Sequence, residues 1–345
     1  MNNGNYRRNR RRYKVRYDRI FAVVLVLIVL IVIITSCTKG CSDDEPKPSA
    51  SQSSVVDNLT GSNPAQQQTD ANGQASAVPE GSDPAQASDP AAAAEFTTQN
   101  VEYTQVYSGD LVLINSLHDY KFQEGDVTLT TLYDNRNSFY SVKDNVLQLD
   151  SNTITQLNAL MEAYASAAGN TDLQVIGGYR TLEEQTDKYN SAKSKFPGGY
   201  TDYHSARTFD IGIFPESGYS NYYAPDGNYA WFNDNAANYG FIVRFPDGKD
   251  SVTGEEARTY TFRYVGIPHA VYMKQNNLCL EEYIEQIKTY TSTNTLKVTS
   301  GTSQYEVYYV PANPNAATGV PVPSKSPYTI SGNNVDGFIV TLQLA

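Results

Sequence analysis

The chain has 345 residues, enough for one or two domains. Its formal net charge is −11 at pH 7, which excludes a general nucleic-acid binder, because such proteins present a basic surface. The charge is unevenly divided: residues 1–19 hold eight Lys and Arg side chains and one Asp, a sum of +7, so the remaining residues carry −18. This division indicates that the two parts occupy different compartments.

An apolar run follows the basic segment and predicts a membrane anchor. Residues 20–34 contain only apolar side chains, and with Thr35 and Ser36 they approach the length of about 17–25 residues that a spanning helix needs. The preceding basic cluster predicts a cytoplasmic segment at 1–19, a transmembrane signal anchor at 20–36 and an extracellular C-terminal part. The alternative is a lipoprotein, because residues 34–37 resemble a bacterial lipobox that would place a lipid on Cys37.

Residues 37–100 have the composition of a spacer. They are rich in Ser, Ala, Gln, Pro, Asp and Gly and contain few large apolar side chains. Such a segment cannot bury enough surface to offset the conformational entropy of the chain, so we expect it to be disordered. Next to an anchor, it would hold a domain away from the membrane.

Alternating strand and helix patterns begin near residue 101. Residues 101–290 predict an α+β domain with a small mixed or antiparallel sheet flanked by helices, because the elements lack regular βαβ spacing. The expected strands are 111–115, 173–176, 210–214, 241–245 and 262–265, and the expected helices are 154–168, 181–195, 231–239 and 280–290. Residues 291–345 predict a small β extension, because alternating patterns are separated there by Pro and Gly turns.

Several blocks of the folded part resemble one protein family. They are Gly177-Gly178-Tyr179-Arg180-Thr181 with Glu184-Gln185, residues 201–212, residues 231–246, and Phe262-Arg263-Tyr264-Val265-Gly266 with His269-Ala270. In this order, and over roughly residues 108–290, they resemble the VanY-type zinc D-alanyl-D-alanine carboxypeptidases of bacterial cell walls. The resemblance implies the fold of such a peptidase and a cleft for peptidoglycan stem peptides.

The metal site implied by the resemblance is degenerate in this chain. The family has a His and an Asp seven residues apart, and a second His and a base Glu just before the Phe-Arg-Tyr-Val-Gly block. Aligned without gaps, Asp210 keeps the family's Asp, whereas Tyr203 and Thr261 replace the two His ligands and Arg258 replaces the base. A one-residue deletion would instead bring His204 into the first ligand position.

The substrate side of the pattern is retained. Arg180 matches the Arg that, by resemblance, contacts the peptide carboxylate, and a guanidinium suits a carboxylate because it donates two parallel hydrogen bonds. Gln185, Thr201 and Arg263 also match family positions that line or brace the cleft.

Two hypotheses follow, and whether the chain is an enzyme stays open between them. The first is a membrane-anchored, extracellular, non-catalytic family member without zinc or another cofactor. It would bind a stem peptide or a cell-envelope protein through the cleft that the family uses for its substrate. The alternative is an active metallo-carboxypeptidase that removes terminal D-Ala with relocated zinc ligands such as His204. The ligand count favours the first, because a catalytic zinc site needs about three protein ligands and a base near the metal-bound water.

Overall fold

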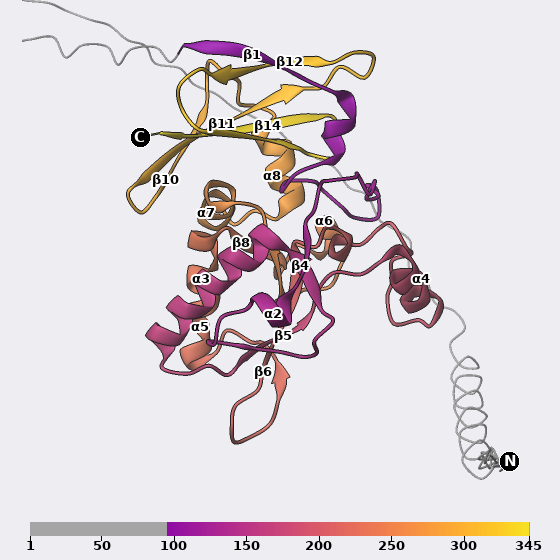
Figure 1. The fold of residues 1–345 in the computed structure, drawn as a ribbon, viewed down its shortest axis with the longest axis vertical. Helices are drawn as coiled ribbons and strands as arrows, with labels where there is room; N and C mark the ends of the chain where they lie inside the picture. The colour runs from indigo at the N-terminus through magenta and orange to yellow at the C-terminus, as the bar shows by residue number, and fades with distance from the viewer. Residues whose placement is uncertain (1–94, 345) are drawn as a thin grey trace, which may run out of the picture. The chain divides into compact units, whose positions relative to one another are not determined.

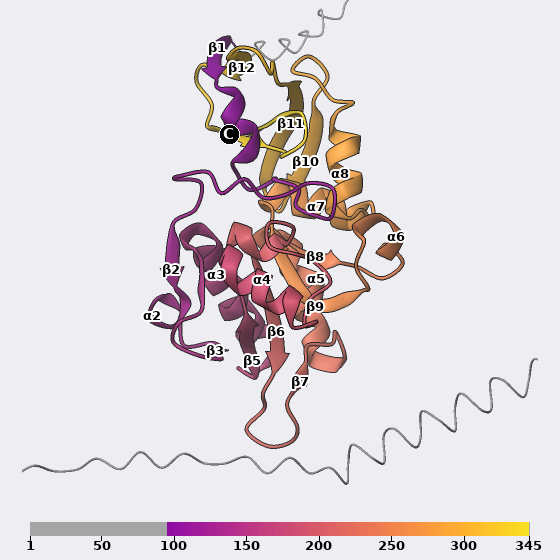
Figure 2. The ribbon, with the colours of Figure 1, turned by 90° about the vertical axis from the view of Figure 1, so that its right-hand side faces the viewer.

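A computed structural model of the chain describes residues 95–344. The expected cytoplasmic segment at 1–19, the anchor at 20–36, Cys37 and the spacer up to residue 94 lie outside the described residues. Within residues 95–344, no helix has both the length and the apolar character required to cross a membrane. Figures 1 and 2 show the described residues in colour.

A six-stranded sheet forms the centre of the larger part of the fold. Its strand order is β3-β5-β6-β9-β8, and the short β7 also pairs with β6 (Figure 2). The strands are Ser141–Val142 (β3), Leu173–Gly177 (β5), Thr208–Ile213 (β6), Asn221–Tyr222 (β7), Phe241–Phe245 (β8) and Arg258–Tyr264 (β9). The pair β3–β5 is parallel and the others are antiparallel. The expected α+β class with a small mixed sheet is therefore confirmed.

Side-chain alternation gives this sheet an apolar face and a more polar face. Five fully buried side chains on the apolar face belong to one core cluster: Leu173, Val175, Phe209, Ile211 and Phe262. Successive side chains of a strand point to opposite faces, so the intervening residues Gln174, Ile176, Asp210 and Gly212 lie on the other face. The two faces thus separate the core from the surface on which a site can form.

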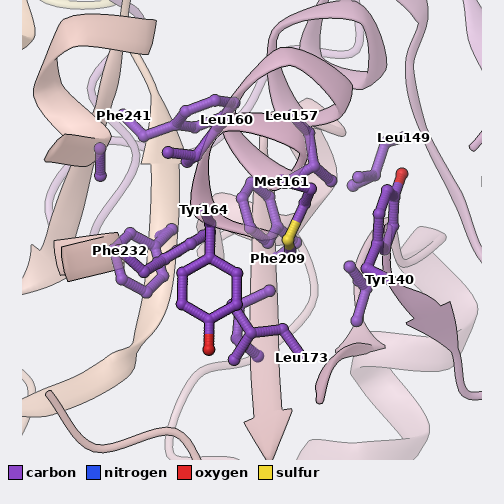
Figure 3. Close-up of a cluster of buried hydrophobic side chains, with 14 of the residues drawn as sticks. Tyr140, Leu149, Leu157, Leu160, Met161, Tyr164, Leu173, Phe209, Phe232 and Phe241 are labelled. Atoms are coloured by element: carbon purple, nitrogen blue, oxygen red, sulfur yellow. The ribbon is translucent and has the colours of Figure 1, made fainter. Parts of the chain in front are cut away.

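Helix α3 (Ser151–Ala168) covers the apolar face. Asp150 caps its start by accepting hydrogen bonds from the backbone N–H groups of Asn152 and Thr153, and Gly169 ends it with a φ of 70°. Its apolar side chains recur at helical spacing, and they pack against side chains of the sheet and of helix α5 (Ala230–Asn235) (Figure 3). The helix expected over residues 154–168 is therefore confirmed.

Shorter elements surround the sheet. The helices are α2 (Leu132–Asn135), α4 (Leu182–Asn190), α6 (Asp250–Thr253), α7 (Ile267–Gln275) and α8 (Leu280–Ile287). The 3-10 turns are η1 (Tyr103–Tyr107), η2 (Asp202–Ser205), η3 (Gly227–Tyr229) and η4 (Ala236–Tyr239). Strands β2 (Leu129–Thr131) and β4 (Gln148–Asp150) form a separate two-stranded sheet. The expected helix 181–195 ends at Asn190, and Ala192 has a left-handed φ of 56° that a helix cannot contain. The expected helix 231–239 is divided between α5 and η4.

The expected β extension is present, but it uses both ends of the described chain. Strands β10 (Leu296–Ser300), β11 (Ser303–Pro311), β14 (Gly337–Leu344) and β13 (Tyr328–Gly332) form an antiparallel sheet in that order. Strand β12 (Thr318–Pro323) pairs with β1 (Phe96–Val101), as Figure 1 shows. The expectation of disorder is therefore wrong for residues 96–100, because a distant partner strand satisfies their backbone groups.

The strand expected at residues 111–115 is absent. Hydrogen bonds from a network of buried ion pairs take the place of the backbone pairing that a strand would make. The segment is buried, but guanidinium groups bond to its backbone: Arg263 donates to the carbonyl of Val112 and Arg244 to that of Ile114, both at 3.2 Å. Both arginines also pair with the buried carboxylate of Asp202, and Arg244 pairs with Glu281 at 2.7 Å. These side chains therefore join the N-terminal segment to the sheet.

Candidate ligand-binding cleft

A cleft of about 1220 Å³ lies on the polar side of the central sheet. Its lining includes Gln174 and Ile176 from β5 and Asp210 from β6, which the strand alternation places on this face. Arg180 enters from the connection between β5 and α4. The cleft therefore contains Arg180 and Asp210, two of the residues singled out by the sequence.

Two glycines allow the Arg180 connection to lie close to the sheet. A Cβ on Gly177 would lie 2.8 Å from Oδ2 of Asp210, and one on Gly178 would lie 2.8 Å from the Leu147 side chain. The connection ends at Thr181, whose hydroxyl accepts from the N–H of Glu184 while the Glu184 carboxylate accepts from the N–H of Thr181. This capping box fixes the start of α4 directly after Arg180.

The Arg180 side chain is held in position by two neighbours. Its guanidinium carbon lies 3.7 Å from the centre of the Tyr203 ring, and Nη1 donates to Oε1 of Gln185 at 3.1 Å. Gln185 is buried, and its amide donates to the Ser194 hydroxyl and the Phe196 carbonyl, both at 2.8 Å. Among the described residues, no further acceptor bonds to this guanidinium, so its other N–H groups are available to a ligand.

The three family ligand positions lie together, but they are bonded to one another. The hydroxyls of Tyr203 and Thr261 both donate to Oδ1 of Asp210, each at 2.7 Å. Burial, followed by the nearby Asp210 charge, raises the pKa of Tyr203 well above its usual value. The phenol therefore keeps its proton at physiological pH and donates to Asp210.

These donors do not fit a zinc ion. Zinc in proteins is bound by imidazole nitrogen, thiolate or carboxylate, and this set supplies one carboxylate whose Oδ1 already accepts two hydrogen bonds. Within residues 95–344, no cluster of three or more His, Cys, Asp or Glu side chains could hold a metal ion. The described side chains of this cleft therefore do not supply a ligand set for zinc.

His204 is not available as a relocated ligand in this structure. Its Nε2 accepts from the backbone N–H of Gly199 at 3.0 Å, so Nδ1 carries the proton and donates to the carbonyl of Arg180 at 2.7 Å. Burial lowers the pKa of His204, which favours this neutral ring. His204 therefore braces the Arg180 connection.

Arg258, at the family's base position, is engaged outside the cleft lining. Its guanidinium pairs with Glu255 at 3.2 Å and lies 4.3 Å from the centre of the Phe245 ring. A guanidinium has no lone pair for a proton at physiological pH, so it cannot act as a general base.

Three of the expected substrate-binding residues are placed differently from Arg180. Gln185, Thr201 and Arg263 are buried and do not line the cleft. Gln185 holds Arg180, and Arg263 is bonded to Asp202 and to backbone carbonyls. Of the two roles expected for these residues, lining and bracing the cleft, the structure agrees with bracing for Gln185, while Thr201 is buried and the donors of Arg263 are used within the protein.

Comparisons with known proteins agree with this fold. A family model described as VanY, D-alanyl-D-alanine carboxypeptidase, matches residues 146–267, which include Arg180, Tyr203, Asp210 and Thr261. A D-alanyl-D-alanine carboxypeptidase of Enterococcus faecium is 34% identical over 242 residues, covering 69% of this chain and 76% of the relative. The chain belongs to the VanY family of D-alanyl-D-alanine carboxypeptidases.

Other VanY-related proteins match part or all of the described fold. The bifunctional D-Ala-D-Ala dipeptidase and carboxypeptidase VanXYC of Enterococcus gallinarum is 31% identical over 125 residues, covering 32% of this chain and 66% of the relative. The crystal structure of the vancomycin resistance D,D-dipeptidase VanXYg, in complex with a D-Ala-D-Ala phosphinate analog, matches with a TM-score of 0.63 and 26% identity, covering 72% of this chain and all of that chain.

The VanY-like cleft also contains residues that the sequence did not single out. Lys143 and Lys188 line it, from the end of β3 and from the last turn of α4. Neither belongs to a family block, so only the packing of β3 and α4 around the cleft reveals them.

Proposed function

We propose that this chain is a zinc-less, non-catalytic member of the VanY family that binds the D-Ala-D-Ala end of peptidoglycan stem peptides. One observation carries the proposal: the hydroxyls of Tyr203 and Thr261 donate to Asp210, while Arg180 in the same cleft keeps unused N–H groups. The cleft therefore lacks the donors for a metal but retains a cation that suits a C-terminal carboxylate.

The choice of ligand rests on the relatives. The Enterococcus faecium relative is a D-alanyl-D-alanine carboxypeptidase, and the VanXYg structure contains a D-Ala-D-Ala phosphinate analog. A ligand with a terminal carboxylate would meet Arg180, and its amide N–H groups could donate to Oδ2 of Asp210, which faces Gly177 beside the cleft. A cell-envelope protein with an exposed C-terminus presents the same group.

Location is part of the same proposal. The basic segment at 1–19 and the apolar run at 20–34 support a single-pass anchor with the folded part outside the cell, where peptidoglycan lies. Lipidation of Cys37 is the alternative attachment. Protease protection of full-length protein in inverted and right-side-out membrane vesicles tests on which side of the membrane each part lies. A Cys37→Ser variant tests whether attachment depends on lipidation of Cys37.

Metal content and turnover test the non-catalytic part. We expect the purified full-length chain to contain no stoichiometric zinc by elemental analysis and to release no D-Ala from a pentapeptide ending in D-Ala-D-Ala. One zinc per chain, with turnover abolished by Asp210→Ala, would establish the active-enzyme alternative instead.

The binding part is tested at Arg180. Arg180→Ala should weaken calorimetric affinity for that pentapeptide by about 10-fold or more, because a hydrogen bond to a charged group contributes about 1.5–3 kcal/mol. Arg136→Ala is the matched control, since Arg136 also lies over a tyrosine ring, that of Tyr133, but does not line the cleft. Equal affinity in wild type and Arg180→Ala, with both folded by circular dichroism, would place the binding site elsewhere.

A further inference from the structure

Unpaired cations are concentrated in the cleft. Residues 95–344 contain 16 Lys and Arg side chains, and eleven of them lie within 4.0 Å of a carboxylate. The five without such a partner are Arg136, Lys143, Arg180, Lys188 and Lys193. Three of these five line the same cleft: Lys143, Arg180 and Lys188.

Most carboxylates of the same cleft are already engaged by the protein. Asp144 accepts from the N–H groups of Val146 and Leu147 at 3.1 and 2.9 Å. Glu184 accepts from the N–H of Thr181, and Asp210 accepts from two hydroxyls. Asp187 also lines the cleft, but no ion pair joins it to a described cation. The lysines therefore have no ion-pair partner within 4.0 Å, although carboxylates line the same cleft.

Arg180 and Lys143 are close enough to Lys188 for their charges to act on it. Burial lowers the pKa of Lys188, and the charges of Arg180, Lys143 and Lys193 lower it further, whereas Glu184 acts in the opposite direction. A bound anion would relieve this repulsion. The cleft, at about 1220 Å³, has more volume than the roughly 300–1,000 Å³ of typical small-molecule sites, so it has room beyond a terminal dipeptide at Arg180.

We propose that Lys143 and Lys188 form a second anion subsite, which binds an internal carboxylate of the peptide whose C-terminal carboxylate contacts Arg180. This inference rests on the proposed function and narrows its ligand class to peptides with two carboxylates, one terminal and one on an earlier residue. The cleft would then distinguish an acidic peptide from its amidated counterpart, because an amide presents no charge to the two lysines.

Two synthetic pentapeptides test the subsite with the full-length chain. Both end in D-Ala-D-Ala and differ only at the second position, which is D-Glu in one and D-Gln in the other. We expect the D-Glu peptide to bind about 10-fold more tightly in calorimetry at low salt, since a charge-assisted contact is stronger than a neutral one. Lys143→Gln combined with Lys188→Gln should remove that preference, so that the variant binds the two peptides with equal affinity.

Lys193→Gln is the matched control, because Lys193 is also unpaired but does not line the cleft. It should keep the 10-fold preference. Equal affinity for the two peptides in wild type, or a preference that survives the double substitution, would overturn the subsite. If both peptides bind equally and Arg180→Ala weakens both, the subsite alone fails. If neither peptide binds, the proposed function fails and the subsite fails with it.

Discussion

At the scale of single residues, the chemistry of the cleft depends on which atoms carry protons. An imidazole at positions 203 and 261 would offer a lone pair to a metal ion, with Asp210 as a third ligand. The hydroxyls of Tyr203 and Thr261 instead present protons, and both are donated to Oδ1 of Asp210. The carboxylate is therefore stabilised by hydrogen bonds at the position where the family resemblance implies zinc.

Replacing the two hydroxyl side chains by imidazoles is predicted to produce metal binding. Tyr203→His combined with Thr261→His should bind about one zinc per chain, because the pair would supply two imidazoles beside the Asp210 carboxylate. Elemental analysis after dialysis measures the result, and adding Asp210→Asn should reduce the zinc content. A double variant that binds no zinc would show that the backbone at these positions does not support the ligand geometry.

At the scale of elements, a buried ion-pair network joins segments that are distant in sequence. Asp202 in η2 pairs with Arg263 in β9 and Arg244 in β8, and both arginines bond to the backbone of residues 110–114. This network replaces the strand expected at 111–115. It also explains why Arg263 does not contact the cleft, since its donors are used within the network.

Removing the shared carboxylate should destabilise the fold strongly. Asp202→Asn is expected to cost about 3–5 kcal/mol, because it leaves two buried guanidinium groups without this counter-charge. Urea denaturation monitored by circular dichroism measures the change. Asp234→Asn breaks an exposed pair with Lys274 and should alter stability by less than about 1 kcal/mol. Equal shifts in the two variants would contradict a structural role for the network.

At the scale of the whole described molecule, His269 links the peptidase-like part to the β extension. It lies in α7, and its ring nitrogens contact the Tyr283 hydroxyl in α8 at 2.6 Å and the Thr341 hydroxyl in β14 at 3.0 Å. Burial lowers the pKa of His269 to about 3, so the ring is neutral in the folded protein.

This buried ring predicts loss of stability in mild acid. The unfolded chain binds a proton at His269 near pH 6.5, whereas the folded chain does not until about pH 3, so stability falls as the pH decreases between these values. At pH 5 the loss from this group is about 2 kcal/mol relative to pH 7.5. Urea unfolding at the two pH values measures it, and His269→Gln should show a smaller difference. The same pH difference in both proteins would exclude His269 as the cause.

The sequence alone determined the elements whose signals are local. Helical spacing located α3, short apolar runs located β5 and β8, and the family blocks identified Arg180, Tyr203, Asp210 and Thr261 as one site. The helix and strand assignments hold because such patterns depend on residues close together in the chain, whereas the joint site came from the family resemblance. By resemblance, the sequence also predicts that hydroxyl side chains occupy two imidazole positions of the family.

Only the tertiary structure decided features that depend on distant partners. Strand β1 exists because β12 pairs with it, residues 111–115 bond to buried arginines, and Lys143 and Lys188 line the same cleft although they lie in different parts of the chain. The engagement of His204 and the direction of the Asp210 hydrogen bonds were likewise decided by packing. A residue's type limits which bonds it can make, but the fold determines which partner comes within reach.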